Sequence, residues 1–166
     1  MITRVLATTA LLAARVLAQD EQVFNIVIEQ DNREIPGDSP IELCMASDEQ
    51  LLDIESIVLD PNPPEPGVNL TISAKGTLNS PVVEGSYVDI VVNYGFIQLI
   101  RQRYDLCEVL GKVELECPLD KGYLELTREV AIPEAIPPGL YSVSAQAFTD
   151  EDELLTCLQG EVTFDM

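Results

Sequence analysis

The sequence predicts an all-β fold, an immunoglobulin-like antiparallel β-sandwich made of two sheets. From Ile41 onward, short segments rich in β-branched and other apolar residues follow one another, which is the composition of strands. Turn-forming stretches such as "DPNPPEPG" and "PEAIPPG" separate these segments at short intervals. Hardly any segment has the apolar spacing of an amphipathic helix. Strands of this length and spacing are typical of immunoglobulin-like sandwiches.

Eight strands are expected in chain order, each bounded by turn residues. They are residues 41–45, 51–59, 68–74, 87–100, 112–116, 123–132, 140–148 and 154–164. Besides the two stretches quoted above, the separators are "NSPVVEG", "CPLDKG" and "TDEDE".

The segment "VNLTISA" indicates which side chains of its strand point inward. Its apolar positions alternate with polar ones, and they are Val68, Leu70, Ile72 and Ala74. Asn69 begins the sequon Asn69-Leu70-Thr71 and falls on the polar face, where a glycan can be accommodated. We therefore expect Asn69 to be glycosylated, with an unmodified exposed asparagine as the alternative.

The strand expected at residues 87–100 loses its alternation halfway. Its inward positions are Val88, Ile90, Val92 and Tyr94. After Gly95 the apolar residues no longer alternate, and they are Phe96, Ile97, Leu99 and Ile100. A glycine followed by such a run indicates either a bulge that opens apolar groups on both sides or a fully buried strand. The pattern alone favours the buried strand.

The first 18 residues have the layout of a secretory signal peptide. Arg4 precedes an apolar run, and the small residue Ala18 suits a cleavage site, although Arg15 interrupts the run near that site. An amphipathic N-terminal helix, which would leave the cysteines reduced, is the alternative. The expected division is a signal peptide at 1–18, a polar leader or propeptide at 19–34 and one folded domain at 35–166. No later segment approaches membrane-spanning length, so a soluble mature protein is expected.

Charge and composition exclude several classes of function. Removal of residues 1–18 takes away two arginines and no acid, so the net charge changes from −20 to −22. Such a surface repels nucleic acid and, at neutral pH, anionic membranes. The absence of histidine excludes Ser-His-Asp and Cys-His catalysis and most zinc sites. Glycoside hydrolysis by two carboxylates stays formally open, but the chain has no tryptophan to stack against a sugar. We expect no catalytic residue, metal or cofactor.

Seven ordered segments resemble a known family. They are "IPGDSPIELC", "LDPNPPEPGVNLTISAKG", "VVNYGFIQLI", "DLCE", "CPLDKG", "IPPGLYSVSA" and "LLTCLQGEVTF". Their order and spacing are similar to those of the fungal phosphatidylglycerol/phosphatidylinositol transfer proteins. These belong with the Niemann–Pick type C sterol carriers to the ML lipid-recognition domain family. The resemblance covers residues 35–164.

The resemblance implies a sandwich whose sheets are splayed around an apolar cavity that holds the hydrophobic part of a lipid. The alternation of inward and outward side chains along each strand then selects the residues expected to line this cavity: Ile72, Val88, Ile90, Val92, Tyr94, Phe96, Leu126, Val143 and Ala145. Parity gives the inward face but not how far the space is open, so some of these residues are expected to be packed core. The alternative for Phe96, together with Ile97 and Leu99, is an apolar lip that touches the membrane.

The resemblance also assigns the four cysteines, whose even number suits two disulfides in an oxidising compartment. It implies that Cys44 pairs with Cys157, tying the first strand to the last. It implies that Cys107 pairs with Cys117 to close a stapled hairpin between two strands. Because an open interior forgoes packing, such crosslinks offset a loss of stability.

The function implied is that of a carrier that moves a phospholipid (phosphatidylinositol or phosphatidylglycerol) or a sterol between membranes without chemistry. The alternative is a secreted lipid-recognition or protein-binding module. We expect a monomer that contacts membranes transiently, in the secretory pathway with a vacuolar, lysosome-like or extracellular destination. Four basic residues, Arg101, Arg103, Lys112 and Lys121, form either a local positive rim or a scattered, solvated set.

Overall fold

The computed structural model describes residues 33–45 and 50–165 of the chain. The expected signal peptide and most of the expected leader lie outside these residues. Within them, no helix is long and apolar enough to cross a membrane. At the start of the described part, Glu34 bridges to Glu42 and Ile35 is buried in the core.

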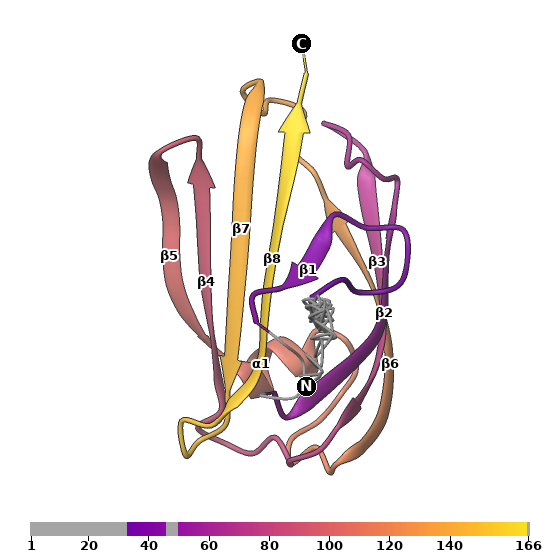
Figure 1. Ribbon diagram of the computed structural model, residues 1–166, viewed down its shortest axis with the longest axis vertical. Coiled ribbons are helices and arrows are strands. Elements are labelled where there is room, and N and C mark those ends of the chain that lie inside the picture. Colours follow the sequence, from indigo (N-terminus) through magenta and orange to yellow (C-terminus); the bar gives the residue numbers. More distant parts are fainter. Residues whose placement is uncertain (1–32, 46–49, 166) are drawn as a thin grey trace, which may run out of the picture.

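The chain forms two antiparallel sheets that face each other (Figure 1). The five-stranded sheet has the order β1-β8-β7-β4-β5, with bounds Ile41–Leu43, Leu154–Phe164, Gly139–Phe148, Tyr87–Tyr94 and Ile97–Asp105. The three-stranded sheet has the order β2-β3-β6, with bounds Leu52–Asp60, Asn69–Leu78 and Gly122–Ala131. The short helix α1, Leu106–Gly111, connects β5 of one sheet to β6 of the other. The prediction of an all-β antiparallel sandwich is confirmed.

The single strand expected at residues 87–100 is instead the hairpin β4–β5. Tyr94 pairs with Ile97, so Gly95 and Phe96 form a two-residue turn. Gly95 has a φ of 53°, which a glycine adopts without strain and which hairpin turns of this length require. All of β5 is exposed, so the interpretation of this region as a fully buried strand was wrong.

The prediction of a strand at residues 112–116 was also wrong. Residues 112–116 belong instead to the turn and irregular segment that follow α1. The Asp105 side chain accepts a hydrogen bond from the Glu108 backbone N–H, which caps the helix at its first turn. The helix has ended by Lys112, and Glu114 adopts a left-handed conformation with a φ of 62°.

Two groups of buried side chains form the core. One lies where β1, β2 and β3 meet, and consists of Ile35, Leu43, Ile57, Leu59 and Leu70. The other lies near α1, and consists of Leu78, Val82, Val88, Ala147 and Leu155. Leu106, Val109 and Leu110 of α1 pack against the second group, so the helix closes that end of the sandwich (Figure 1).

Two disulfides tie these elements together. Cys44, just after β1, is bonded to Cys157 of β8, with the Cα atoms 5.3 Å apart. Cys107 of α1 is bonded to Cys117, with the Cα atoms 5.5 Å apart. The second crosslink does not staple a hairpin, because β5 and β6 belong to different sheets. It holds α1 against the segment that enters β6.

Removing the disulfides is expected to lower stability, and the disulfide that closes the longer loop is expected to contribute more. On the chain-entropy model, the loop of 113 residues closed by Cys44 and Cys157 contributes about 5 kcal/mol, and the loop of 10 residues about 3 kcal/mol. We expect Cys44→Ser/Cys157→Ser to lose more unfolding free energy than Cys107→Ser/Cys117→Ser in urea denaturation. The reverse order would contradict this account.

Candidate functional site

The two sheets diverge from one edge of the sandwich toward the other. Their backbones approach each other at β2 and β8. On the opposite side, side chains on the inner faces of β5 and β6 remain accessible: Ile100 is 45% exposed and Val130 is 37% exposed. The sandwich is therefore a wedge, closed along β2 and β8 and open between β5 and β6.

The wedge contains an apolar pocket that we call the Val143 pocket. It has a volume of about 240 Å³. Its walls include Leu59, Leu70 and Ile72 of the three-stranded sheet and Val143, Ala145 and Leu158 of the other. Val143 is 42% exposed although it faces the opposing sheet, which shows that the space in front of it is not filled by packing.

A second apolar pocket, the Leu126 pocket, lies next to the first. It has a volume of about 270 Å³ and includes Ile54, Ile57, Ala74, Leu124 and Leu126 in its walls. Both pockets share Ile41, Ile72 and Leu158, so they are adjoining parts of one apolar space. Thr156 contributes a buried hydroxyl to the Leu126 pocket that has no hydrogen-bond partner. Such a space suits hydrocarbon.

A third hollow, of about 670 Å³, is larger but chemically different. Ser142, Ser144, Gln159 and Glu161 are among its lining residues. These side chains alternate along β7 and β8 with the inward ones, so the hollow lies on the outer face of the five-stranded sheet. Its hydroxyls, amide and carboxylate make it a poor site for an apolar chain.

Within the described ranges, no group of His, Cys, Asp or Glu could hold a metal ion.

The residues expected to line a cavity fall into three groups. Ile72, Leu126, Val143 and Ala145 line the two pockets. Val88 is core, and Ile90 packs against that core near α1.

The remaining three lie on the β4–β5 hairpin, outside both pockets. Val92 and Tyr94 share the inner face of β4, where the Tyr94 ring lies 5.0 Å from that of Tyr141 and its hydroxyl donates to the Pro138 carbonyl. Phe96 occupies the turn, exposed to solvent rather than placed in the cavity wall.

Several pocket residues were not selected from the sequence. The most prominent are Leu158 and Val162 of β8 and Ile41 of β1. The alternation in "LLTCLQGEVTF" places Leu158 and Val162 on one face together with Gly160, so the signal for β8 was present. Ile41 lies in a strand of only three residues, which is too short for parity to be read.

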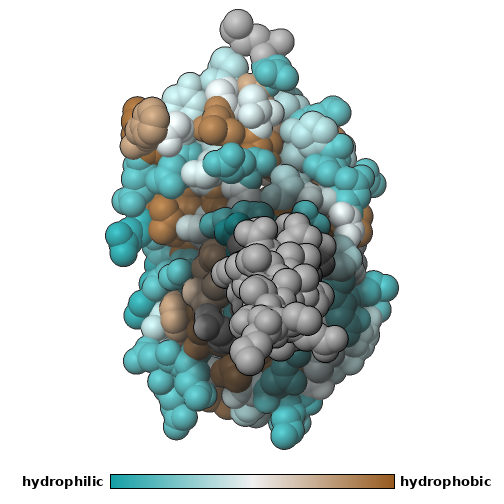
Figure 2. Space-filling model, in the orientation of Figure 1, coloured by the Kyte–Doolittle hydropathy of each residue, from teal (hydrophilic) through white to brown (hydrophobic). Residues whose placement is uncertain are grey.

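The turn of the β4–β5 hairpin carries an apolar surface that we call the hairpin lip: Phe96, Ile97, Leu99 and Ile100. Phe96 is fully exposed, and the other three are about half exposed. Figure 2 shows hydrophobic atoms projecting at the upper left, where Figure 1 places this turn. Contiguous exposed apolar groups of this kind mark interaction surfaces.

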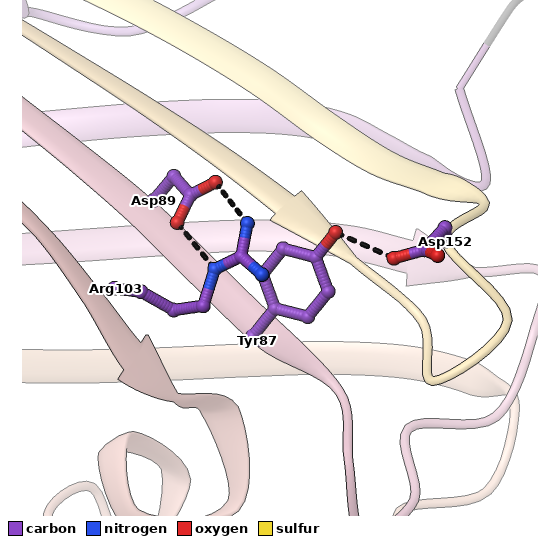
Figure 3. A network of polar contacts seen from close by, with 4 residues as sticks. All are labelled: Tyr87, Asp89, Arg103 and Asp152. Carbon is purple, nitrogen blue, oxygen red and sulfur yellow. Dashed lines mark hydrogen bonds and ion pairs between the residues drawn. The ribbon is translucent and has the colours of Figure 1, made fainter.

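A polar network anchors the other end of the same hairpin (Figure 3). The Arg103 guanidinium of β5 donates two hydrogen bonds to the Asp89 carboxylate of β4, at 2.8 and 2.7 Å. The same guanidinium lies 3.7 Å from the centre of the Tyr87 ring. The Tyr87 hydroxyl donates to Asp152 in the turn between β7 and β8. These contacts hold β5 on β4, while the lip lies at the far end.

The Asp89–Arg103 pair is expected to make a pH-dependent contribution to stability. The hydrogen bonds from Arg103 lower the pKa of Asp89 below its ordinary value of 3.8. A lowered carboxyl pKa stabilises the folded state above the ordinary pKa, and this contribution is lost as the pH falls through the lowered value. We expect Asp89→Asn to lower the melting temperature slightly at pH 6, because the pair is exposed. The two proteins should converge as the pH falls through the lowered pKa of Asp89. A difference that stayed constant down to pH 2 would exclude this linkage.

Comparisons with known proteins agree with this geometry. The model of the ML domain family matches residues 38–164. The chain is 51% identical over 135 residues to a phosphatidylglycerol/phosphatidylinositol transfer protein of Candida albicans, covering 81% of this chain and 70% of that protein. It is 41% identical over 161 residues to the Neurospora crassa protein of the same name, covering 95% and 91%.

Two solved structures have a similar fold. A Niemann-Pick type C2 protein from Japanese carpenter ant superimposes with a TM-score of 0.55 at 15% identity, covering 75% of this chain and 98% of that one. Chicken MD-1 complexed with lipid IVa gives a TM-score of 0.53 at 16% identity, covering 75% and 91%. At these identities the likeness concerns the fold, and it confirms the immunoglobulin-like class.

Proposed function

Because the chain belongs to the ML domain family, we propose that it is a lipid carrier that binds one lipid between its sheets and transfers it between membranes without chemistry. The lipid is a phospholipid, with phosphatidylinositol and phosphatidylglycerol as the first candidates, or a sterol. The names of the fungal relatives support this proposal. The two disulfides fit a protein of the secretory pathway. We place it in a vacuole-like or extracellular compartment.

The observation that carries the proposal is the apolar space inside an open wedge. A sandwich normally fills the region between its sheets with interdigitating side chains. Here Val143 faces that region and is still 42% exposed, with one apolar pocket in front of it and a second adjoining the first. A hydrocarbon chain in this space would remove apolar surface of both protein and lipid from water.

The hairpin lip would provide the membrane contact that transfer requires. The chain has a net charge of −20, so charge attraction does not bring it to an anionic bilayer. Phe96 and its apolar neighbours extend from the end of the hairpin, on the side of the wedge that is open. Inserted into a membrane surface, they would shorten the path of the lipid through water. A monomer is sufficient for this mechanism.

A transfer assay tests the proposal against a recognition module on the same fold. Donor vesicles would contain a fluorescent, self-quenched phosphatidylglycerol or a fluorescent sterol, with an excess of unlabelled acceptor vesicles. We expect the protein to accelerate exchange of at least one of these lipids in proportion to its concentration. Binding without faster exchange would instead favour a recognition module, and failure to bind phosphatidylglycerol, phosphatidylinositol or a sterol would exclude the carrier.

We further propose that Asn69 carries an N-linked glycan. Asn69 is exposed at the start of β3, and its side-chain amide donates to Glu129 on the outer face of β6. A glycan there would extend into solvent away from both pockets. We expect protein from a eukaryotic secretory host to lose mass on treatment with a peptide N-glycosidase, and Asn69→Gln protein to show no such loss. An untreated mass equal to that of the polypeptide would exclude the modification.

A further inference from the structure

Arg128 is a charged residue on the inner face of β6, beside the apolar space. Its register partner is Ile72, which lines both pockets, and Leu126 two residues earlier lines one of them. The neighbouring residues Thr127 and Glu129 are exposed on the opposite face. Because β6 is the edge of its sheet on the open side of the wedge, Arg128 lies at the mouth between β5 and β6.

The surroundings of Arg128 leave its charge unmatched. One guanidinium N–H donates to the Lys112 carbonyl, just after α1, and no carboxylate in the described part of the chain pairs with it. This differs from Arg103, which is bound to Asp89, and from Lys75, whose Nζ lies 3.0 Å from Glu125. In a chain of net charge −20, a cation on the inner face without an acidic partner is a distinctive feature.

A guanidinium in this position suits a phosphate group. It presents several N–H groups in a planar fork that matches two phosphate oxygens, while its aliphatic stem packs on apolar surface. We propose that Arg128 binds the phosphodiester of a phospholipid at the mouth of the wedge while the acyl chains occupy the pockets. This inference rests on the proposed carrier function and deepens it, because the contact would favour phospholipids over neutral lipids of the same chain length.

The test compares two lipids that differ only in the head group. Fluorescent phosphatidylglycerol and fluorescent diacylglycerol with identical acyl chains are titrated with wild-type protein, Arg128→Gln and Lys121→Gln. The glutamine retains an N–H donor for the Lys112 carbonyl but removes the charge. Lys121→Gln is the matched control, since Lys121 is exposed just before β6 and lines neither apolar pocket. Arg128→Lys keeps the charge and loses the planar fork.

We expect Arg128→Gln to weaken phosphatidylglycerol binding about tenfold, as for the loss of charge-assisted hydrogen bonds, with diacylglycerol binding unchanged. Lys121→Gln should affect neither lipid, and Arg128→Lys should restore part of the affinity. An equal loss for both lipids would show that Arg128 only supports the fold, and no loss for either would also overturn the inference. Wild-type protein that bound diacylglycerol but not phosphatidylglycerol would overturn the inference and leave a carrier of neutral lipids. Binding of no lipid, sterol included, would overturn the carrier function itself.

Discussion

Replacing Val143 with tryptophan is expected to remove most lipid binding while the protein stays folded. Val143 lines an apolar pocket and is 42% exposed within the wedge, so the indole can enter space that is not occupied by other side chains. It would displace several methylene groups of the ligand, each worth about 0.8 kcal/mol of burial. We therefore expect the affinity to fall at least about tenfold. Lipid titration and thermal melting of the same preparation measure the two effects.

Ser144→Trp is the matched control for this variant. Ser144 is the next residue along β7 and lines the polar hollow on the outer face, so its substitution adds the same bulk on the other side of the sheet. We expect it to bind lipid like the wild type. If Val143→Trp unfolded the protein and Ser144→Trp did not, Val143 would be packed core. If Val143→Trp bound lipid normally, the ligand would lie elsewhere.

Replacing Phe96 with aspartate is expected to slow transfer about tenfold or more, since burying a phenylalanine side chain in the membrane is worth about 1.5–3 kcal/mol. Equilibrium binding and melting temperature should change little, because Phe96 is fully exposed before docking and contributes no packing. The measurement is the initial rate of exchange between zwitterionic vesicles, which removes the effect of repulsion between like charges.

Two further variants separate apolar contact from charge. Gln98→Asp adds the same charge to β5 at a polar position, and we expect it to transfer lipid at nearly the wild-type rate. Phe96→Ala removes the ring without adding charge and should slow transfer almost as much as Phe96→Asp. Equal rates for Phe96→Asp and Gln98→Asp would show that the hairpin lip does not enter the membrane. A large drop in melting temperature for Phe96→Asp would contradict its exposure.

Much of the fold could be predicted because local pattern and tertiary structure agree along most strands. In β3, alternation placed Leu70, Ile72 and Ala74 on one face, and these side chains do pack inward. The wrong predictions concern two segments in which a short sequence signal, for a turn or for a helix cap, was not used. "YGFI" has glycine at the first central position of a two-residue turn, which indicates a hairpin. "DLCE" has an acidic cap followed three residues later by glutamate, which indicates a helix start.

The candidate site was harder to predict. Alternation along a strand shows which side chains point inward, but it does not show where the two sheets separate. Val88 and Val143 have the same inward parity on neighbouring strands, yet Val88 is buried near α1 and Val143 faces open space. The difference comes from α1, which fills one end of the wedge and was not expected there. Arg128 was overlooked for a related reason. Only the register of β6 against Ile72 places this charged side chain on the inner face.

The most direct test of the account is native mass spectrometry of protein isolated without detergent from a secretory host. If the apolar space holds a lipid, the spectrum should contain a species heavier than the disulfide-bonded chain, with any glycan accounted for, by the mass of one phospholipid or sterol. Collisional activation should release that lipid for identification, and Val143→Trp protein should lack most of the heavier species. Lipid-free wild-type protein that also acquired no lipid after incubation with vesicles of phosphatidylglycerol, phosphatidylinositol and sterol would contradict the account.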